Sequence, residues 1–104
     1  DETAVELILL GGKGDISVTA NVAPAEVARM NTLALEGRAE EARALNQQLM
    51  SLHQSMFVEA NPIPVKWALN QMGKIPSGIR LPLTVLSEGK QDAVRQALAN
   101  ANLV

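Results

Sequence analysis

The chain has 104 residues, of which 47% are hydrophobic, and its formal net charge at pH 7 is -2. This size and composition are typical of one small globular domain, and the acidic balance with only two aromatic residues, Phe57 and Trp67, argues against a nucleic-acid-binding surface. The chain has no cysteine, which excludes disulfides, and no apolar run approaches the roughly 20 residues that span a bilayer. We therefore expect a cytoplasmic protein.

Residues 1–10 are predicted to form a helix, because their apolar residues share one helical face. These residues are Ala4, Val5, Ile8 and Leu9. The stretch GGKG follows at residues 11–14, and a phosphate loop would require the order strand, glycine loop, helix. Here the order is reversed, so we interpret Gly11 as a left-handed helix C-cap and the cluster as a turn.

A strand is predicted over residues 16–22, where Ile16, Val18 and Ala20 alternate along the sequence. A single strand leaves both of its edges unpaired, which is unusual for a domain that contains a sheet. The chain also begins with Asp1 rather than methionine. Together these features lead us to expect a piece of a longer protein.

Four more helices are predicted after the strand. The first begins at Pro24 and ends at Gly37, and the second covers residues 38–59. The apolar seam of the second helix repeats in steps of three and four and must face another helix. It consists of Ala42, Leu45, Leu49, Leu52 and Met56.

The third of these helices follows Asn61, a possible cap, and is closed by Gly73. A loop is expected over residues 74–86, and Ser87 is a plausible N-cap for the last helix. The buried face of that last helix is predicted to consist of Ala93, Val94, Ala97, Leu98 and Ala101.

The residue types alone show no catalytic constellation. His53 lies beside the apolar seam without a serine, cysteine or acid spaced to form a triad, and we interpret it as a helix-flank histidine. Trp67 is expected to pack between elements. One histidine and no cysteine make a zinc site improbable, and we expect neither a metal nor a cofactor.

Charged residues offer further candidates. Acids at a helix junction favour the positive start of the next helix, so a capping role is the better interpretation of Glu36, Glu40 and Glu41 than paired catalytic carboxylates. A Schiff-base lysine must be desolvated, and none of the lysines meets that requirement. The lysines considered are Lys13, Lys66, Lys74 and Lys90.

Four stretches resemble the C-terminal part of the dihydrodipicolinate synthase family: GGKGDISVTANVAP, LALEG, NPIPVKWALNQMG and GIRLPL. The resemblance covers essentially the whole chain in order. The related N-acetylneuraminate lyases and keto-acid aldolases share the scaffold but differ in these stretches.

The resemblance implies an α/β fold, the (β/α)8 TIM barrel, with an added α-helical C-terminal subdomain. Residues 1–37 would be the last αβα portion of the barrel, with helix 7, strand 8 and helix 8, and residues 38–104 the subdomain. The glycine cluster would then lie on the stability face of the barrel, and TANVAP on the active-site face. The fragment itself is expected to be mostly helical.

The resemblance also implies a function for the parent protein. Family members are class I aldolase-type lyases of lysine and diaminopimelate biosynthesis, and homotetramers. They condense pyruvate with L-aspartate semialdehyde through a lysine Schiff base to give 4-hydroxy-tetrahydrodipicolinate. The chain lacks the catalytic lysine and tyrosine of the family, so the fragment alone is expected to be inactive. One substrate-binding position carries over, namely Ile16, whose backbone carbonyl would face the keto acid.

An alternative interpretation is a stand-alone helical interaction module. In that case the seam from Ala42 to Met56 would bind a helix of a partner protein.

The fragment interpretation also predicts self-association through residues 1–24, because a lone strand and the barrel-facing helix sides would be exposed.

Overall fold

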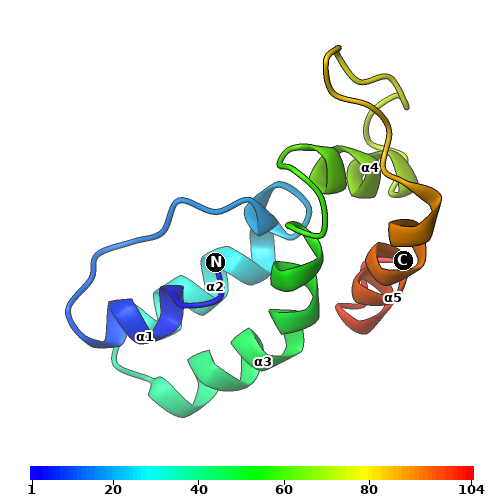
Figure 1. Cartoon of the computed structure of the whole chain (residues 1–104). Helices are drawn as coiled ribbons and strands as arrows, with labels where there is room; N and C mark the ends of the chain where they lie inside the picture. Colours follow the sequence, from blue (N-terminus) through cyan, green and yellow to red (C-terminus); the bar gives the residue numbers. More distant parts are fainter.

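The computed structural model describes residues 1–104. It contains five α-helices and one short 3-10 helix, which together form an elongated, all-helical arrangement (Figure 1). In chain order these are α1 (Ala4–Leu9), η1 (Thr19–Asn21), α2 (Pro24–Leu35), α3 (Ala39–Ser55), α4 (Ile63–Gln71) and α5 (Glu88–Asn100). All five predicted helices are therefore confirmed, although α3 ends at Ser55 instead of reaching residue 59.

Glycines end three of the helices, as their positions in the sequence predict. Gly11, Gly37 and Gly73 have φ of 118°, 76° and 74°, in the region where a side chain would be unfavourable. After α2, the N–H of Gly37 donates to the carbonyl of Ala34 and the N–H of Arg38 to that of Leu33. This pair of bonds is a Schellman motif, and it satisfies carbonyls that the helix end would otherwise leave unpaired.

The strand predicted over residues 16–22 is wrong for this chain. Residues 13–17 carry no regular structure, and Thr19–Asn21 form η1, flanked by Val18 and Val22 in helical conformation. A ladder of hydrogen bonds needs a second strand, and the chain contains none. The alternating residues Ile16, Val18 and Ala20 therefore do not form a strand. The side chain of Ile16 is fully exposed.

Two predicted caps also differ from the structure. Asn61 does not cap α4, because Pro62 occupies the position before the helix and no side chain caps it. Ser87 does precede α5, but its hydroxyl bonds to the carboxylate of Glu59 rather than to the helix backbone. The backbone N–H of Ser87 donates to the same carboxylate, at 3.1 Å. Both bonds lower the pKa of Glu59 below its ordinary value.

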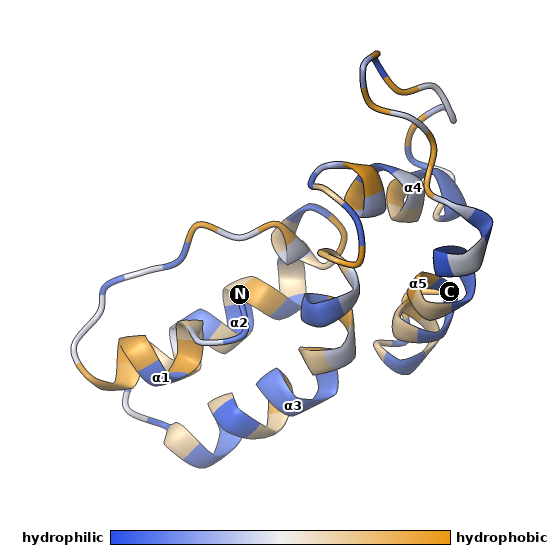
Figure 2. Cartoon of the chain, in the orientation of Figure 1, coloured by the Kyte–Doolittle hydropathy of each residue, from blue (hydrophilic) through white to orange (hydrophobic).

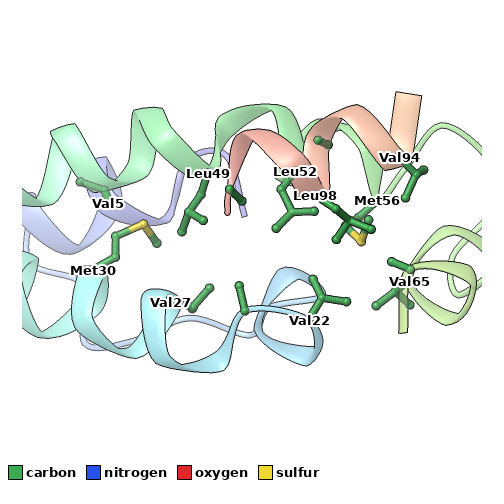
Figure 3. Packing of buried hydrophobic residues seen from close by; sticks show 14 of the residues in the cluster. Val5, Val22, Val27, Met30, Leu49, Leu52, Met56, Val65, Val94 and Leu98 are labelled. Atoms are coloured by element: carbon green, nitrogen blue, oxygen red, sulfur yellow. The ribbon is translucent and has the colours of Figure 1, made fainter. Parts of the chain in front are cut away.

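One hydrophobic cluster includes residues from all five α-helices, and within it α3 contacts both α2 and α5. Figure 3 shows side chains of this cluster, among them Val27 and Leu49, in the space between α2 and α3. The predicted seam is confirmed, because Leu49, Leu52 and Met56 are fully buried and Leu45 is partly buried. On α5 the predicted face is also confirmed, except that Ala93 is exposed.

Trp67 packs between elements as predicted, since it lies buried on α4 with the guanidinium of Arg95 from α5 over its ring, 5.1 Å from the centroid. The loop before α5 holds Ile79 and Leu83 against the core. In contrast, α1 is hydrophobic over much of its length (Figure 2), yet Leu7 on this helix and Leu10 directly after it are 59% and 86% exposed. None of the helices has the length and apolar character needed to cross a membrane.

Candidate functional site

A buried polar cluster joins the C-terminal half of α3 to η1. The side chain of His53 is fully buried, and its Nδ1 lies 2.8 Å from Oγ1 of Thr19, which is also fully buried. On the other side of the ring, Nε2 lies 3.2 Å from Oδ1 of Asn46, seven residues earlier on the same helix. The interpretation of His53 as a helix-flank residue is therefore wrong.

The partners of the ring define its protonation. Because Oδ1 of Asn46 can only accept a hydrogen bond, Nε2 carries the proton, and Nδ1 is left to accept from the Thr19 hydroxyl. Burial penalises the charged imidazolium and is the main reason why the pKa of His53 lies below its ordinary value of 6.5. The positive N-terminus lowers this pKa further, whereas Asp15 and Glu2 act in the opposite direction. At neutral pH the ring is therefore neutral.

A second anchor holds the same segment from the other side. The carboxylate of Asp1 accepts hydrogen bonds from the backbone N–H groups of Val18 and Thr19, at 3.0 and 3.2 Å. It also accepts a bond from the hydroxyl of Ser17, whose oxygen in turn accepts from the N–H of Ala20. The backbone from Ser17 to Ala20 is thus tied to α3 through one side chain and to the residues before α1 through another.

An open cleft of about 450 Å³ lies between this segment and α4. Ile16 stands at its edge, and neither its backbone N–H nor its carbonyl forms a hydrogen bond within the chain. The cleft is lined by Ile16, Ser17, Val18, Asn21, Asn61, Pro62, Val65, Lys66, Leu69 and Ile75. The single predicted substrate-binding residue therefore lies at a concave surface that combines apolar side chains with two amides and one ammonium group.

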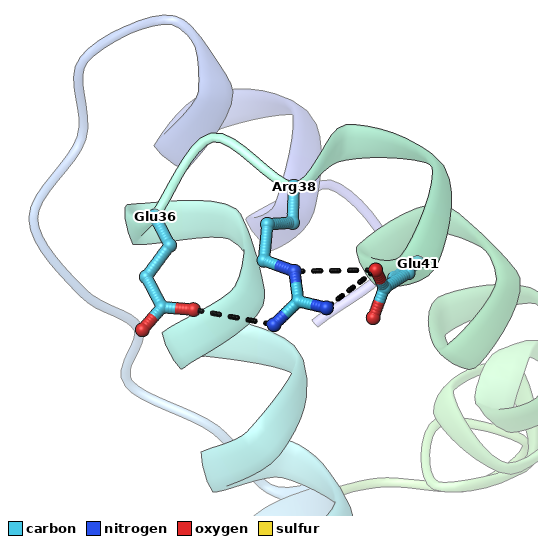
Figure 4. Close-up of polar contacts among 3 residues, drawn as sticks. All are labelled: Glu36, Arg38 and Glu41. Atoms are coloured by element: carbon cyan, nitrogen blue, oxygen red, sulfur yellow. Dashed lines mark hydrogen bonds and ion pairs between the residues drawn. The ribbon is translucent and has the colours of Figure 1, made fainter.

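The charged candidates do not assemble into a site. Arg38 lies between Glu36 and Glu41, with nitrogen–oxygen distances of 3.9 and 2.7 Å (Figure 4), and all three side chains are more than half exposed. Glu40 and Glu41 occupy the first turn of α3, where acids are favoured by the helix dipole. This arrangement supports the predicted electrostatic role at the helix junction.

The lysine candidates are all exposed, so none is desolvated in the way that Schiff-base chemistry requires. They are Lys13, Lys66, Lys74 and Lys90. No group of three or more His, Asp or Glu side chains lies close enough together to hold a metal ion.

The cluster around His53 could have been detected in the sequence. Asn46, Leu49 and His53 are spaced by three and four residues, which places them on one face of the helix with the buried seam. A histidine at a seam position needs a hydrogen-bond partner, and Asn46 is in reach. The contact with Thr19, which lies 34 residues earlier in the chain, leaves no such local signal.

Comparison with known proteins gives one consistent family. The model of the dihydrodipicolinate synthetase family matches residues 1–101. The chain is 66% identical over 103 residues to 4-hydroxy-tetrahydrodipicolinate synthase of Cellvibrio japonicus and 64% identical over 104 residues to that of Pseudomonas putida. These alignments cover 99% and 100% of the chain, but only 36% of each relative.

Solved structures agree with these relatives. The chloride-inhibited dihydrodipicolinate synthase of Acinetobacter baumannii in complex with pyruvate superposes with a TM-score of 0.96 and 48% identity, over 99% of this chain and 35% of the other. The synthase of Thermotoga maritima gives a TM-score of 0.94 at 39% identity, over 99% of this chain and 35% of the other. The chain thus spans about a third of the length of the proteins that it matches, and it has the fold of the corresponding third.

Proposed function

Because the chain belongs to the dihydrodipicolinate synthetase family, we propose that it is the C-terminal third of a lyase that condenses pyruvate with L-aspartate semialdehyde in lysine biosynthesis. The observation that carries the proposal is 66% identity to the Cellvibrio japonicus synthase over 99% of the chain. A structural relative that binds pyruvate, with a TM-score of 0.96, supports a keto acid as substrate.

The fold of the parent would be a TIM barrel with a C-terminal helical subdomain. Residues 1–37 would close the barrel, and residues 38–104 would form the subdomain. Solved synthases that superpose on this chain with TM-scores of 0.96 and 0.94 support that arrangement. In the parent, residues 14–22 would form the eighth strand of the barrel and would pair with strands that other parts of the parent supply.

Within the site, the backbone carbonyl of Ile16 would face the bound keto acid. This role is supported by the position of Ile16 at the cleft and by its unbonded carbonyl. The chain contains no tyrosine, and its lysines are exposed, so the Schiff-base lysine and the proton-relay tyrosine would belong to the other two thirds of the parent. The chain alone would therefore be inactive. We also propose, from the family resemblance, that the parent is a cytoplasmic homotetramer.

The second candidate, a stand-alone interaction module, fits the structure less well. Such a module would need the seam of α3 to be available to a partner helix. Instead, Leu49, Leu52 and Met56 are fully buried inside the chain by its own helices.

A fusion protein tests the proposal. Residues 1–104 would replace the matching segment of the Cellvibrio japonicus synthase, and the purified fusion would be assayed for condensation of pyruvate with L-aspartate semialdehyde. We expect activity from the fusion and none from the 104-residue chain. A folded fusion without activity would contradict the proposal.

Borohydride trapping locates the chemistry in the same two proteins. With pyruvate and borohydride, we expect a single adduct on a lysine outside residues 1–104 of the fusion, and no adduct on the isolated chain. A stoichiometric adduct on Lys13 or Lys66 would show that the catalytic lysine had been assigned to the wrong part of the protein.

A further inference from the structure

We propose that His53 is a positioning residue that holds the substrate-binding segment around Ile16 in place through its hydrogen bond to Thr19. The inference rests on the proposed function for the role of Ile16. It adds a residue from the helical subdomain that touches no substrate and acts through the backbone of η1.

Burial makes this hydrogen bond specific. Both side chains are fully buried, so neither can exchange its partner for water. Losing one partner would leave a buried polar atom unsatisfied, which is more costly than the bond itself is favourable. The hydroxyl of Thr19 therefore has one position, and the backbone of Thr19 is fixed with it.

The segment before Thr19 depends on this anchor because it has little other support. Residues 13–17 form no backbone hydrogen bonds, and the side chain of Ile16 is fully exposed. Beyond η1 and the two residues that follow it, residues 17–19 are bonded by two side chains, the carboxylate of Asp1 and the ring of His53. Nearer in sequence, the carbonyl of Val18 accepts from Asn21, and the carbonyl of Thr19 accepts from the N–H groups of the two residues after η1. In this chain, where residues 13–17 form no backbone hydrogen bonds, a shift of Thr19 would therefore be transmitted to Ile16, three residues away. In the parent, neighbouring strands would hold part of the segment, so the same shift would be smaller there.

The hydrogen bond between His53 and Thr19 explains why a residue of the subdomain can affect the site. His53 lies near the end of α3 and reaches back 34 residues to η1. Catalytic rates depend on placement of the reacting groups to within about an ångström. We therefore expect a displaced Ile16 carbonyl to weaken the productive placement of the keto acid.

Two substitutions of His53 separate positioning from general stability. Asparagine retains a polar atom where Nδ1 lies and can still accept from Thr19, but it loses the contact with Asn46. Glutamine retains a polar atom where Nε2 lies and can still reach Asn46, but it loses the contact with Thr19. Both variants lose one buried bond, so a merely structural role predicts similar effects of His53→Asn and His53→Gln.

The first readout uses the 104-residue chain and is independent of activity. We expect His53→Gln to accelerate hydrogen exchange of the Val18 and Thr19 amides about tenfold under native conditions, and His53→Asn to leave it within about twofold of the unmodified chain. Equal exchange in the two variants would overturn the proposal. Thr19→Val, which removes the hydroxyl at nearly constant shape, should behave like His53→Gln, and Thr19→Ser should behave like His53→Asn.

The second readout uses the active fusion described above. We expect His53→Gln to lower kcat/KM for pyruvate about threefold, less than the effect on exchange, because strands of the parent would hold part of the segment. KM for L-aspartate semialdehyde should change less than twofold, and His53→Asn should retain most of the activity. In the double variant Thr19→Val/His53→Gln, the loss should be no greater than in either single variant. Equal kinetic losses in His53→Asn and His53→Gln would contradict positioning, whereas an inactive unmodified fusion would contradict only the proposed function.

Discussion

The carboxylate of Asp1 accepts a hydrogen bond of 3.0 Å from the backbone N–H of Val18, so the residues before α1 are tied directly to the start of η1. The same carboxylate also accepts from Thr19 and Ser17. Three donors on one carboxylate make Asp1 the main polar support of this segment outside α3.

Replacing Asp1 with alanine is expected to destabilise the chain. The carboxylate is partly buried, and hydrogen bonds to a charged group contribute about 1.5–3 kcal/mol each, reduced here by solvent exposure. We expect Asp1→Ala to lower the free energy of unfolding by about 1–2 kcal/mol in urea titrations. The exposed neighbour Glu2→Ala is the control, and equal effects of the two substitutions would contradict the role of Asp1.

The buried His53 should make stability depend on pH. Its pKa is lowered by burial, so between the folded pKa and the ordinary value of 6.5 the unfolded chain binds a proton that the folded chain does not. Its contribution to stability is complete above pH 6.5 and is lost as the pH falls through the folded pKa. The slope attributable to His53 can reach at most about 1.4 kcal/mol per pH unit.

Urea titrations at pH 7.5, 6.5 and 5.5 test this dependence. We expect the free energy of unfolding to fall over this series in the unmodified chain and to change less in His53→Asn, which has no titratable group at that position. Parallel pH profiles of the two proteins would mean that other groups cause the loss.

The centre of α3 should be the most sensitive part of the core. Leu52 is fully buried, and truncation of a buried leucine to alanine typically costs about 2–5 kcal/mol, which is a large share of the stability of a small domain. Leu7, which is 59% exposed on α1, is the matched control, and its truncation should cost about 0.5 kcal/mol or less. Circular dichroism during thermal unfolding would measure the unfolding midpoints of Leu52→Ala and Leu7→Ala. Similar midpoints for the two variants would contradict the prediction that the core is centred on α3.

The guanidinium of Arg95 should stabilise the folded chain because its positive charge lies over the ring of Trp67. A guanidinium at this distance from an indole contributes about 0.5–1 kcal/mol at a solvent-accessible position. We expect Arg95→Met to lower the stability by this amount and to alter the emission of Trp67, which is the only tryptophan. Asp92→Asn removes the exposed ion pair of Arg95 but leaves the cation over the ring, so it should change the emission little.

Exposed apolar residues near the start of the chain should make it self-associate. Leu10 is 86% exposed, Ile16 is fully exposed, and no sheet covers either residue. We expect sedimentation to show concentration-dependent association that Ile16→Lys weakens without loss of helical signal. Val18 is unsuitable for this test, because it packs partly against the core. A compact monomer at all concentrations before any substitution would contradict the prediction.

Much of the fold could be predicted because the relevant signals are local. Each α-helix has its own apolar periodicity, and glycine ends three of them at the expected positions. Boundaries were less accurate, as the early end of α3 at Ser55 shows, because the residues that follow contact the core in turns rather than in a helix.

The two errors that affect the candidate site concern interactions between distant residues. The alternating pattern around Ile16 indicated a strand, but a strand exists only when another strand pairs with it, and residue order alone does not show whether a partner is present. Likewise, the spacing of residues along α3 places His53 beside the seam, but the hydroxyl that donates a hydrogen bond to its ring comes from Thr19 in η1.

Helix positions, the apolar seam and the resemblance to one family could thus be recognised in the order of the residues, since each depends on spacing within a short stretch or on matching motifs. The three-dimensional arrangement decided which polar groups became buried together. Asn46 and His53 share one face of α3, but Thr19 reaches them only because the tertiary structure brings η1 within hydrogen-bond distance of that helix. Burial then excludes water and makes the three side chains depend on one another.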